Sequence, residues 1–320
     1  MNILLVYKKS VYELYKDSPD AEVRAYAAEP ENLQKLLDSH NEQQRTLETI
    51  AADLNWLGMT HKELYRAELQ NLSPKDFAGY DLILSVGGDG TFLEVSHYIH
   101  NSNVPLLGVN SDPHRSVGYF CSAHRNNFRF LMKGLKREPT TTLNRLQLIR
   151  DGIPLPELVL NDILFAHANP AANTRFTLEV AKKGRNGIAE REKKATEKET
   201  EEEKWKEPQH YHGSNGLLVC TAAGSTAWMY NLGGEVMGLG SQQMQYKVRD
   251  AHGEKPHFTE ELRITSQTRE GKIWVDGAHL NYELGLGGVL EIKPGTPLTV
   301  IGDLQVKRKE WERKEKEKKL

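Results

Sequence analysis

The chain has 320 residues, of which 38% are hydrophobic and 27% are charged, and its formal net charge is −2. This profile is typical of a globular protein of about two domains, and the near-neutral charge excludes a global field for nucleic acid. The two cysteines, Cys121 and Cys220, are far apart and form no CxxC pair, which argues against a disulfide scaffold or a cysteine zinc site. The chain begins directly in an apparent strand and has no 18-residue apolar run, so we expect a soluble, cytoplasmic protein without membrane contacts.

The first part of the chain alternates short apolar runs with amphipathic stretches. The expected strands are 3–7, 64–69, 82–86 and 105–109, and the expected helices are 33–37, 45–57, 90–98 and 127–135. This alternation predicts an α/β domain with an open parallel sheet. Ligands bind such sheets beyond the carboxyl ends of their strands.

A glycine-rich turn, Gly87-Gly88-Asp89-Gly90-Thr91, follows the strand at 82–86 and opens the next helix. Glycines let the backbone approach a ligand, and a helix start offers unpaired N–H groups, so the turn indicates a phosphate cradle. It fits neither the Walker nor the GxGxxG pattern. A carboxylate about 4 Å from a phosphate is repelled by roughly 1 to 4 kcal/mol. Asp89 therefore either holds Mg²⁺ against the phosphates or accepts the proton of an attacking hydroxyl, and both roles predict phosphoryl transfer. The alternative is that Asp89 only caps the helix.

From Pro139 onward the sequence pattern changes to short runs that are rich in β-branched residues or alternate between apolar and polar residues, without helical segments between them. The expected strands are 146–150, 157–165, 175–180, 216–221, 262–265, 272–275, 289–292 and 298–301, with one helix after Ser225. We therefore expect a mostly β, sandwich-like second domain. The predicted boundaries are 1–130 for the α/β domain, 131–306 for the β domain with a charged insertion at 186–208, and 307–320 for a charged tail. The runs 190–207 and 307–319 lack an apolar face and are predicted to be solvated surface segments.

Two polar motifs stand out in the second domain. Asn161 and Asp162 interrupt an apolar strand, so they form either an internal hydrogen-bond network or a ligand contact, such as an amide pairing with the edge of adenine. The segment 221–228 is small and hydroxylated and ends in Trp228, which could stack on a base. Its alternative is a tight connection in which Ser225 is a cap and Trp228 lies in the core.

Four motifs in this order resemble the NAD kinase family over about residues 80–300. They are Gly87–Thr91, Asn161-Asp162, Gly224–Trp228 with Gly233-Gly234, and Val275-Asp276-Gly277. The segments 108–113, 115–118, 160–165 and 220–226 are most similar to the plant-type NADH kinase branch. The resemblance implies an α/β nucleotide-binding domain, a β-sandwich-like domain, a homo-oligomer (dimer or tetramer), ATP and a divalent metal such as Mg²⁺. It also implies transfer of a phosphoryl group to the 2′-hydroxyl of the adenosine ribose of NAD or NADH.

The resemblance also implies functional roles for individual residues. Asp89 matches the residue that engages the ribose hydroxyls and accepts the proton, which agrees with the chemistry inferred from the turn. Asn161 and Asp162 match the pair that contacts the adenosine half, and Trp228 stands where most members have Tyr. The other expected substrate contacts are Gly87, Gly88, Gly90, Thr91, Leu93, Tyr119, Thr226, Ala227 and Asn231. Further candidates are Asn110, Arg115, Asn215, Ser225 and Asp276, and no residue is assigned as a metal ligand.

One departure from the family pattern concerns the acceptor. Many members carry Gly-Asp-Gly where this chain has Gly213-Ser214-Asn215-Gly216, so an acidic residue expected near the nicotinamide end is missing. Because oxidised nicotinamide is cationic and the reduced ring is neutral, the hypothesis is that NADH is accepted well or preferred. The alternatives are a lipid kinase of the diacylglycerol or sphingosine type, which shares the Gly-Gly-Asp-Gly turn, and a non-catalytic nucleotide-binding sensor. The sequence leaves open whether ATP or polyphosphate is the donor.

Overall fold

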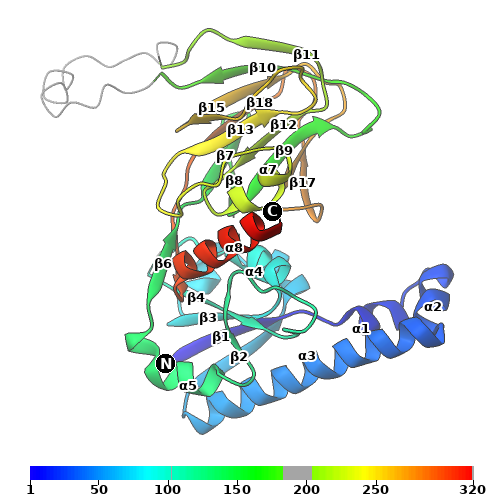
Figure 1. Cartoon of the computed structure of the whole chain (residues 1–320), viewed down its shortest axis with the longest axis vertical. Coiled ribbons are helices and arrows are strands. Elements are labelled where there is room, and N and C mark those ends of the chain that lie inside the picture. Colours follow the sequence, from blue (N-terminus) through cyan, green and yellow to red (C-terminus); the bar gives the residue numbers. More distant parts are fainter. Residues whose placement is uncertain (102, 183–203, 319–320) are drawn as a thin grey trace, which may run out of the picture. The chain divides into compact units, whose positions relative to one another are not determined.

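The computed structural model describes residues 1–101, 103–182 and 204–318. The chain forms two compact units, one of residues 1–142 and 298–320 and the other of residues 143–297 (Figure 1). These divisions fall at 142/143 and 297/298, whereas the sequence analysis placed them at 130/131 and 306/307. Most of the charged run at 190–207 lies outside the described residues.

The first unit is built on a seven-stranded sheet in the order β2-β1-β3-β4-β19-β6, with β5 also paired to β4. Its strands are β1 (Asn2–Tyr7), β2 (Thr60–Tyr65), β3 (Leu82–Gly87), β4 (Leu106–Asn110), β5 (Cys121–His124), β6 (Thr140–Leu143) and β19 (Leu298–Ile301). Strands β2, β1, β3, β4 and β5 run parallel, and β19 is parallel to β4. The expected α/β class is confirmed.

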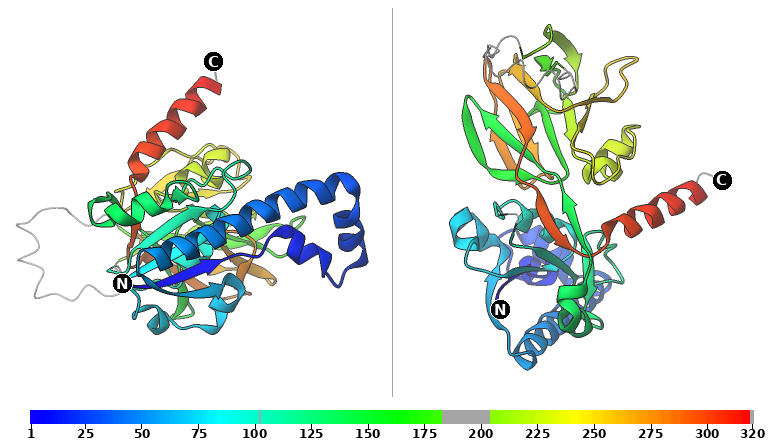
Figure 2. Two further views of the ribbon diagram at one scale, coloured as in Figure 1. Left: turned by 90° about the horizontal axis from the view of Figure 1, so that it is seen from below. Right: turned by 90° about the vertical axis from the view of Figure 1, so that its left-hand side faces the viewer.

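Beside its sheet, the first unit contains several helices (Figures 1 and 2). They are α1 (Val11–Lys16), α2 (Ala21–Ala28), α3 (Pro30–Trp56), α4 (Asp89–Ser96), α5 (Phe128–Gly134) and α8 (Leu304–Lys318), with 3₁₀ turns at Arg66–Asn71, Pro74–Phe77 and Leu135–Arg137. Ile50 and Leu54 of α3 and Phe128 of α5 pack with the fully buried strand residues. Each such side chain contributes about 1.5–3 kcal/mol on burial.

Three predictions about the first unit are corrected. The helices expected at 33–37 and 45–57 are one helix, α3, because Pro30 starts it and the polar residues between them, such as Ser39 and Gln43, hydrogen-bond to the rest of the unit without interrupting it. The strand expected at 64–69 is β2 at 60–65, an edge strand in which only Leu64 is fully buried, so its polar first half carries no apolar signal. The strand at 298–301 was assigned to the β domain, but β19 returns to the parallel sheet beside β4.

The second unit consists of two six-stranded antiparallel sheets. One has the order β11 (Gln209–Ser214), β10 (Thr174–Val180), β15 (Leu262–Ser266), β18 (Val289–Pro294), β7 (Leu146–Arg150) and β8 (Ile153–Val159). The other has the order β14 (His257–Thr259), β13 (Met244–Val248), β12 (Leu217–Cys220), β9 (Asp162–His167), β16 (Gly271–Val275) and β17 (Leu280–Glu283). Inward residues of both sheets, among them Phe165, Phe176 and Leu290, share one core, which is the expected sandwich.

Two further expectations meet a different outcome in the structure. The single strand expected at 157–165 is two strands, β8 and β9, which belong to different sheets and are separated at Leu160 and Asn161. The charged tail, expected to be a solvated segment or a surface helix, is helical through Lys318 as part of α8 (Leu304–Lys318), but the side chain of Arg308 within it is buried. The helix expected after Ser225 is the short α7 (Trp228–Asn231). No helix in the described ranges combines the length and apolar character needed to cross a bilayer.

Candidate functional site

The glycine-rich turn lies at the carboxyl edge of the parallel sheet. Gly87 ends β3, Gly88 is the N-cap of α4, and Asp89 is its first residue. A Cβ on Gly87 would lie 2.4 Å from Thr91 Oγ1, so the tight return of the chain onto its own strand requires glycine. The start of α4 has no side-chain cap, which leaves its first N–H groups available for an anion.

The Asp89 carboxylate does not cap the helix, which excludes that alternative. Instead, Oδ2 accepts a hydrogen bond from the Tyr119 N–H at 2.9 Å and Oδ1 accepts one from the Phe120 N–H at 2.9 Å. Asp89 is half-buried, and these two bonds fix the direction of its carboxylate. Each oxygen retains acceptor capacity for a further proton or hydroxyl.

The loop after β4 supplies the neighbouring part of this edge. Asn110 shapes the loop, because its side chain donates to the Ser116 carbonyl at 3.0 Å and accepts from the Asp112 N–H at 3.1 Å. Arg115 is exposed and pairs with Asp112 at 3.4 Å. Two buried oxygens in this region, Thr91 Oγ1 and Asp112 Oδ1, have no hydrogen-bond partner. Unpaired buried polar atoms are costly, so they favour a site that is completed by a ligand or water.

Lys8 is a candidate site residue that the sequence analysis missed. It follows β1, whose Tyr7 is in register with Val86 of β3, so it leaves the sheet at the same edge as Gly87. Burial is the main cause that lowers the pKa of its ammonium group, and Arg66 lowers it further, whereas Asp112 and Cys121 act in the opposite direction. A half-buried cation at a phosphate cradle fits the charge of a polyphosphate. This position of Lys8 follows only from the parallel register of β1 and β3, because no sequence motif includes Lys8.

In the second unit, Asp276 organises the segment that carries Asn161 and Asp162. Its carboxylate accepts three hydrogen bonds, from the N–H groups of Leu160 at 2.8 Å, Asn161 at 2.7 Å and Asp162 at 2.9 Å. Asp276 is buried and has φ of 48°, an uncommon conformation outside glycine. The three bonds explain why the chain breaks between β8 and β9, and they identify Asp276 as the residue that shapes this segment.

Asp162 is a buried acid beside another acid. Burial, and secondly the negative charge of Asp276, raise its pKa to about 7. Burial also lowers the pKa of Arg145 to about 9, against the attraction of Asp276. Asn161 is half-buried, and its Oδ1 is buried without a hydrogen-bond partner. An acid that titrates near neutrality next to an unpaired amide oxygen is typical of a ligand-binding site.

Asp162 and Trp228 line the same cavity. Its volume is about 240 Å³, and its other lining residues are Leu164, Trp274, Gly277 and Ala278. The indole of Trp228 is 37% exposed, so it is not a core residue. Two tryptophans and one carboxylate provide stacking surfaces and a polar anchor, as a nucleoside requires.

The segment before Trp228 has the expected tight geometry. A Cβ on Gly224 would lie 2.1 Å from the carbonyl oxygen of Asn161, so this glycine lets the two motifs touch. Ser225 is fully buried; its hydroxyl donates to the Ala222 carbonyl at 2.8 Å and accepts from the Met237 N–H at 2.9 Å. The remaining candidates differ in exposure: Thr226 and Ala227 are half-buried beside Trp228, Asn231 is exposed at the end of α7, and in the first unit Leu93 and Tyr119 are half-buried.

Asn215 lines a second cavity, of about 290 Å³, together with Arg249. This cavity shares Leu164 and Trp274 with the first one. Asn215 Nδ2 donates to Asp250 Oδ2 at 2.6 Å, and the Arg249 guanidinium lies 5.2 Å from the centre of the Trp228 ring. The structure therefore places a cation, Arg249, in the same cavity as Asn215, where the family resemblance leads us to expect a carboxylate. The sequence analysis did not single out Arg249.

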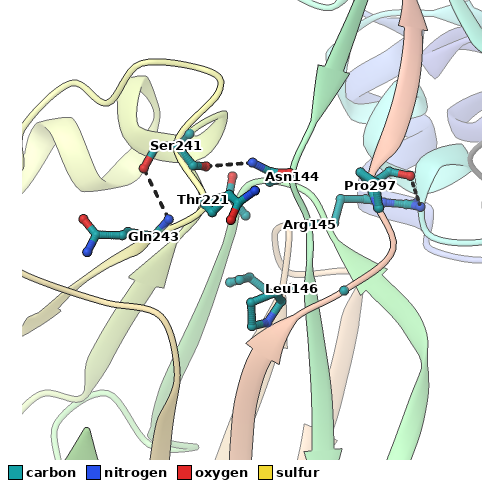
Figure 3. A pocket seen from close by; sticks show the side chains of 11 residues that line it. Asn144, Arg145, Leu146, Thr221, Ser241, Gln243 and Pro297 are labelled. Atoms are coloured by element: carbon teal, nitrogen blue, oxygen red, sulfur yellow. Dashed lines mark hydrogen bonds between the residues drawn. The ribbon is translucent and has the colours of Figure 1, made fainter. Parts of the chain in front are cut away.

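A third cavity, of about 250 Å³, is lined by Thr221 and by Asn144, Arg145 and Ser241 (Figure 3). Asn144 Nδ2 donates to the Ser241 carbonyl at 2.8 Å across its wall. The guanidinium of Arg145 is directed at the carbonyls of Thr296, at 2.9 Å, and Pro297, at 3.4 Å. The Arg145 contacts thus join the first and the last residues of the second unit, and the Asn144 contact joins its start to the loop at Ser241.

The described ranges contain no group of three or more His, Cys, Asp or Glu side chains that could hold a metal ion. This outcome leaves the expected divalent metal without an assigned ligand set, as in the sequence analysis.

Comparison with known proteins places the chain in a family. Residues 10–134 match the family model described as ATP-NAD kinase N-terminal domain. A protein of Oryza sativa subsp. japonica named "Probable NADH kinase" is 33% identical over 251 residues, which are 69% of this chain and 70% of the relative. The chain belongs to the NAD kinase family. The NADH kinase of Arabidopsis thaliana is 32% identical over 271 residues, 68% of this chain and 71% of the relative.

Solved structures agree with this family at the level of fold. An NAD kinase from Archaeoglobus fulgidus, in complex with ATP, superposes with a TM-score of 0.59 at 18% identity and covers 97% of this chain and 96% of its own. A yeast NADH kinase complexed with NADH superposes with a TM-score of 0.60 at 14% identity and covers 95% of this chain and 84% of its own. The NAD kinase fold expected from the sequence is thus confirmed.

Proposed function

We propose that this NAD kinase family member transfers the terminal phosphoryl group of ATP to the 2′-hydroxyl of the adenosine ribose of NAD or NADH, and so forms NADP or NADPH. The observation that carries this proposal is the fixed carboxylate of Asp89 at the start of α4. A binding-only phosphate site would gain affinity by losing that charge, whereas a kinase needs a proton acceptor at the attacking hydroxyl. The 33% identical relative and the Arabidopsis protein are both named NADH kinases, which supports the same reaction.

The roles of the residues follow from their chemistry. Asp89 takes the proton of the ribose hydroxyl while the N–H groups of Tyr119 and Phe120 hold its carboxylate in place. The Gly87–Gly90 turn and the start of α4 bind phosphate oxygens through backbone N–H groups, and Lys8 adds a cation for the donor. Asp162 accepts from the adenosine half, and Trp228 stacks on a ring.

We propose Mg-ATP as the donor. A divalent cation neutralises the phosphate charge that Asp89 would otherwise repel. In this proposal the metal enters with the nucleotide and is held chiefly by the donor phosphates. Turnover should disappear with excess EDTA and return with added Mg²⁺, and inorganic polyphosphate in place of ATP tests the alternative donor.

The acceptor preference is the finer part of the proposal. Asn215 has replaced the family's carboxylate, and the Arg249 guanidinium lines the same cavity. The guanidinium lies 5.2 Å from the centre of the Trp228 ring, and the nearby Asp250 carboxylate accepts a hydrogen bond from Asn215 Nδ2. A cation there disfavours oxidised nicotinamide and leaves the neutral reduced ring unaffected. We therefore propose that NADH is used at least as well as NAD⁺.

Product analysis tests the reaction itself. The purified protein is incubated with Mg-ATP and either acceptor, and the product is examined by mass spectrometry and ³¹P NMR. A monophosphate ester on the 2′-hydroxyl of the adenosine ribose is the expected product. Phosphorylated diacylglycerol or sphingosine from vesicles, with no dinucleotide product, would instead support the lipid-kinase alternative.

Two properties of the whole protein complete the proposal. We propose a homo-oligomer, dimer or tetramer, to be measured by light scattering after size-exclusion chromatography. We also propose the cytoplasm as its location. Cys121 and Cys220 are both buried thiols, which suits a reducing compartment, and cell fractionation tests it.

A further inference from the structure

The first turns of α8 contact the segment that holds Asp89. Lys307 Nζ donates to the Gly118 carbonyl at 3.0 Å and to the Cys121 carbonyl. The next residue, Arg308, donates from Nε to the Tyr119 hydroxyl at 2.8 Å, and its guanidinium lies 5.7 Å from the centre of that ring. All four residues of the segment 118–121 are thus contacted by α8 or by the Asp89 carboxylate.

The same segment orients the Asp89 carboxylate, because both of its oxygens accept hydrogen bonds from the N–H groups of Tyr119 and Phe120. The carbonyls of its two end residues point to Lys307, and the N–H groups of its two middle residues point to Asp89. The orientation of the Asp89 carboxylate therefore depends on the backbone conformation of residues 118–121. The Lys307 ammonium group holds that conformation through the carbonyls of Gly118 and Cys121.

Lys307 and Arg308 are more buried than the other basic residues of α8. Arg308 is 3% exposed and Lys307 is half-buried, whereas Lys309 on the same helix is exposed. Burial lowers the pKa of the Lys307 ammonium, and Cys121, Asp89 and Glu310 act in the opposite direction. Burying such groups is unfavourable unless each donor is used, and here both carbonyls of the turn are acceptors.

We propose that Lys307 and Arg308 are positioning residues for the Asp89 carboxylate: α8 clamps the segment 118–121, and the segment aims the carboxylate. The inference rests on the proposed function for its kinetic consequence, but the clamp itself is a property of the chain alone. Gly118 contributes to it with φ of 58° and with no room for a Cβ, which would lie 2.4 Å from Asn110 Nδ2. The charged tail thereby acquires a role that its composition does not reveal.

The first test needs no substrate. Hydrogen exchange of the Tyr119 and Phe120 amides is measured by NMR in the wild type and in Lys307→Met, which retains the aliphatic stem but has no donor. The proposal predicts that both amides exchange at least tenfold faster in the variant. Lys309→Met is the matched control, because Lys309 is exposed on the same helix, and it should leave both rates within twofold. Unchanged protection in folded Lys307→Met would overturn the clamp whether or not the protein is a kinase.

The second test is kinetic. Lys307→Met and Arg308→Met should lower kcat at least tenfold while KM for NADH and for ATP changes less than threefold, because a displaced base slows chemistry more than binding. Lys307→Arg, which restores donors, should recover part of kcat. In an Asp89→Asn background Lys307→Met should have no further effect. Full additivity of the two substitutions, or a loss confined to KM, would contradict a positioning role.

Thermal unfolding separates these effects from misfolding. If Lys307→Met unfolds at the assay temperature, Arg308→Met replaces it in both tests, because it removes the donor to the Tyr119 hydroxyl and leaves Lys307 in place. Absence of activity in the wild type would count against the proposed function only, because the exchange measurement decides the clamp independently.

Discussion

The carboxylate of Asp276 accepts the backbone N–H of Asp162 at 2.9 Å, so two buried acids lie side by side in the second unit. One of them is tied by three N–H groups, and the other faces the cavity beside Trp228. Asp276 therefore both holds the backbone of residues 160–162 and, through its negative charge, affects the protonation of Asp162, a proposed substrate contact. Because burial and the charge of Asp276 raise the pKa of Asp162 to about 7, we expect stability and dinucleotide binding to depend on pH near neutrality.

The first prediction concerns the free energy of unfolding. Burial raises the pKa of Asp162 from 3.8 to about 7, so between these values the native state binds more protons than the unfolded chain. This contribution to stability is present below about pH 4 and is lost as pH rises towards 7, by at most about 4 kcal/mol. Urea unfolding of wild type and Asp162→Asn at pH 5 and pH 7.5 measures it. The prediction is wrong if Asp162→Asn retains the full pH dependence in this window.

The second prediction concerns acceptor binding. Above about pH 7 Asp162 is a pure hydrogen-bond acceptor, and below it the carboxyl group is increasingly protonated. KM for the dinucleotide should therefore rise as pH falls from 8 to 6, by several-fold, with less change in KM for ATP. Asp162→Asn should show a raised KM that no longer depends on pH in this range.

The third prediction concerns Gly224. An added Cβ would overlap the backbone carbonyl oxygen of Asn161, which cannot move without breaking the Asp276 bonds. Gly224→Ala should cost roughly 1–3 kcal/mol of stability and raise KM for the dinucleotide. Gly238→Ala is the control, because a Cβ at Gly238 meets nothing within 4 Å. Equal melting temperatures and kinetics in the two variants would refute the argument.

The fourth prediction concerns acceptor preference. A unit charge roughly 6 Å from the nicotinamide changes its energy by about 1 to 3 kcal/mol at effective dielectrics of 80 to 20, or several-fold to on the order of 100-fold. Arg249→Met and Asn215→Asp should each raise kcat/KM for NAD⁺ relative to NADH. Arg175→Met, at an exposed position outside this cavity, is the control. A strong preference of the wild type for NAD⁺ would contradict the proposal.

The fifth prediction concerns the donor. Lys8→Met should raise KM for ATP at least fivefold and leave KM for the dinucleotide within twofold, because the ammonium group is placed for phosphate. Lys9→Met provides the comparison, since Lys9 is exposed and lies over the Tyr65 ring at 4.7 Å. Equal effects of the two substitutions on KM for ATP would remove Lys8 from the site.

The sequence predicted those parts of the fold whose signal is local. The strands at 82–86 and 146–150 have apolar runs bounded by turn residues, and the structure has β3 and β7 there. The edge strand β2 and the single helix α3 were misjudged because a mostly exposed element carries little periodicity. The return of β19 to the first sheet is a long-range pairing, which no local pattern encodes.

The candidate site divides in the same way. Motifs built on glycine, such as Gly87 and Gly224, were found because a close backbone approach permits no other residue. Lys8, Arg249 and Lys307 were missed because their roles depend on strand register, cavity lining and helix docking. A single lysine or arginine in a charged chain has no local signature.

The most direct test of the central claim compares wild type with Asp89→Asn in a coupled assay, with Mg-ATP and either NAD⁺ or NADH, in which an enzyme specific for the phosphorylated cofactor reports NADP(H). The account predicts product with the wild type and a loss of at least about 100-fold in kcat with a folded Asp89→Asn variant. No product from either acceptor, or near-normal turnover in Asp89→Asn, would contradict it.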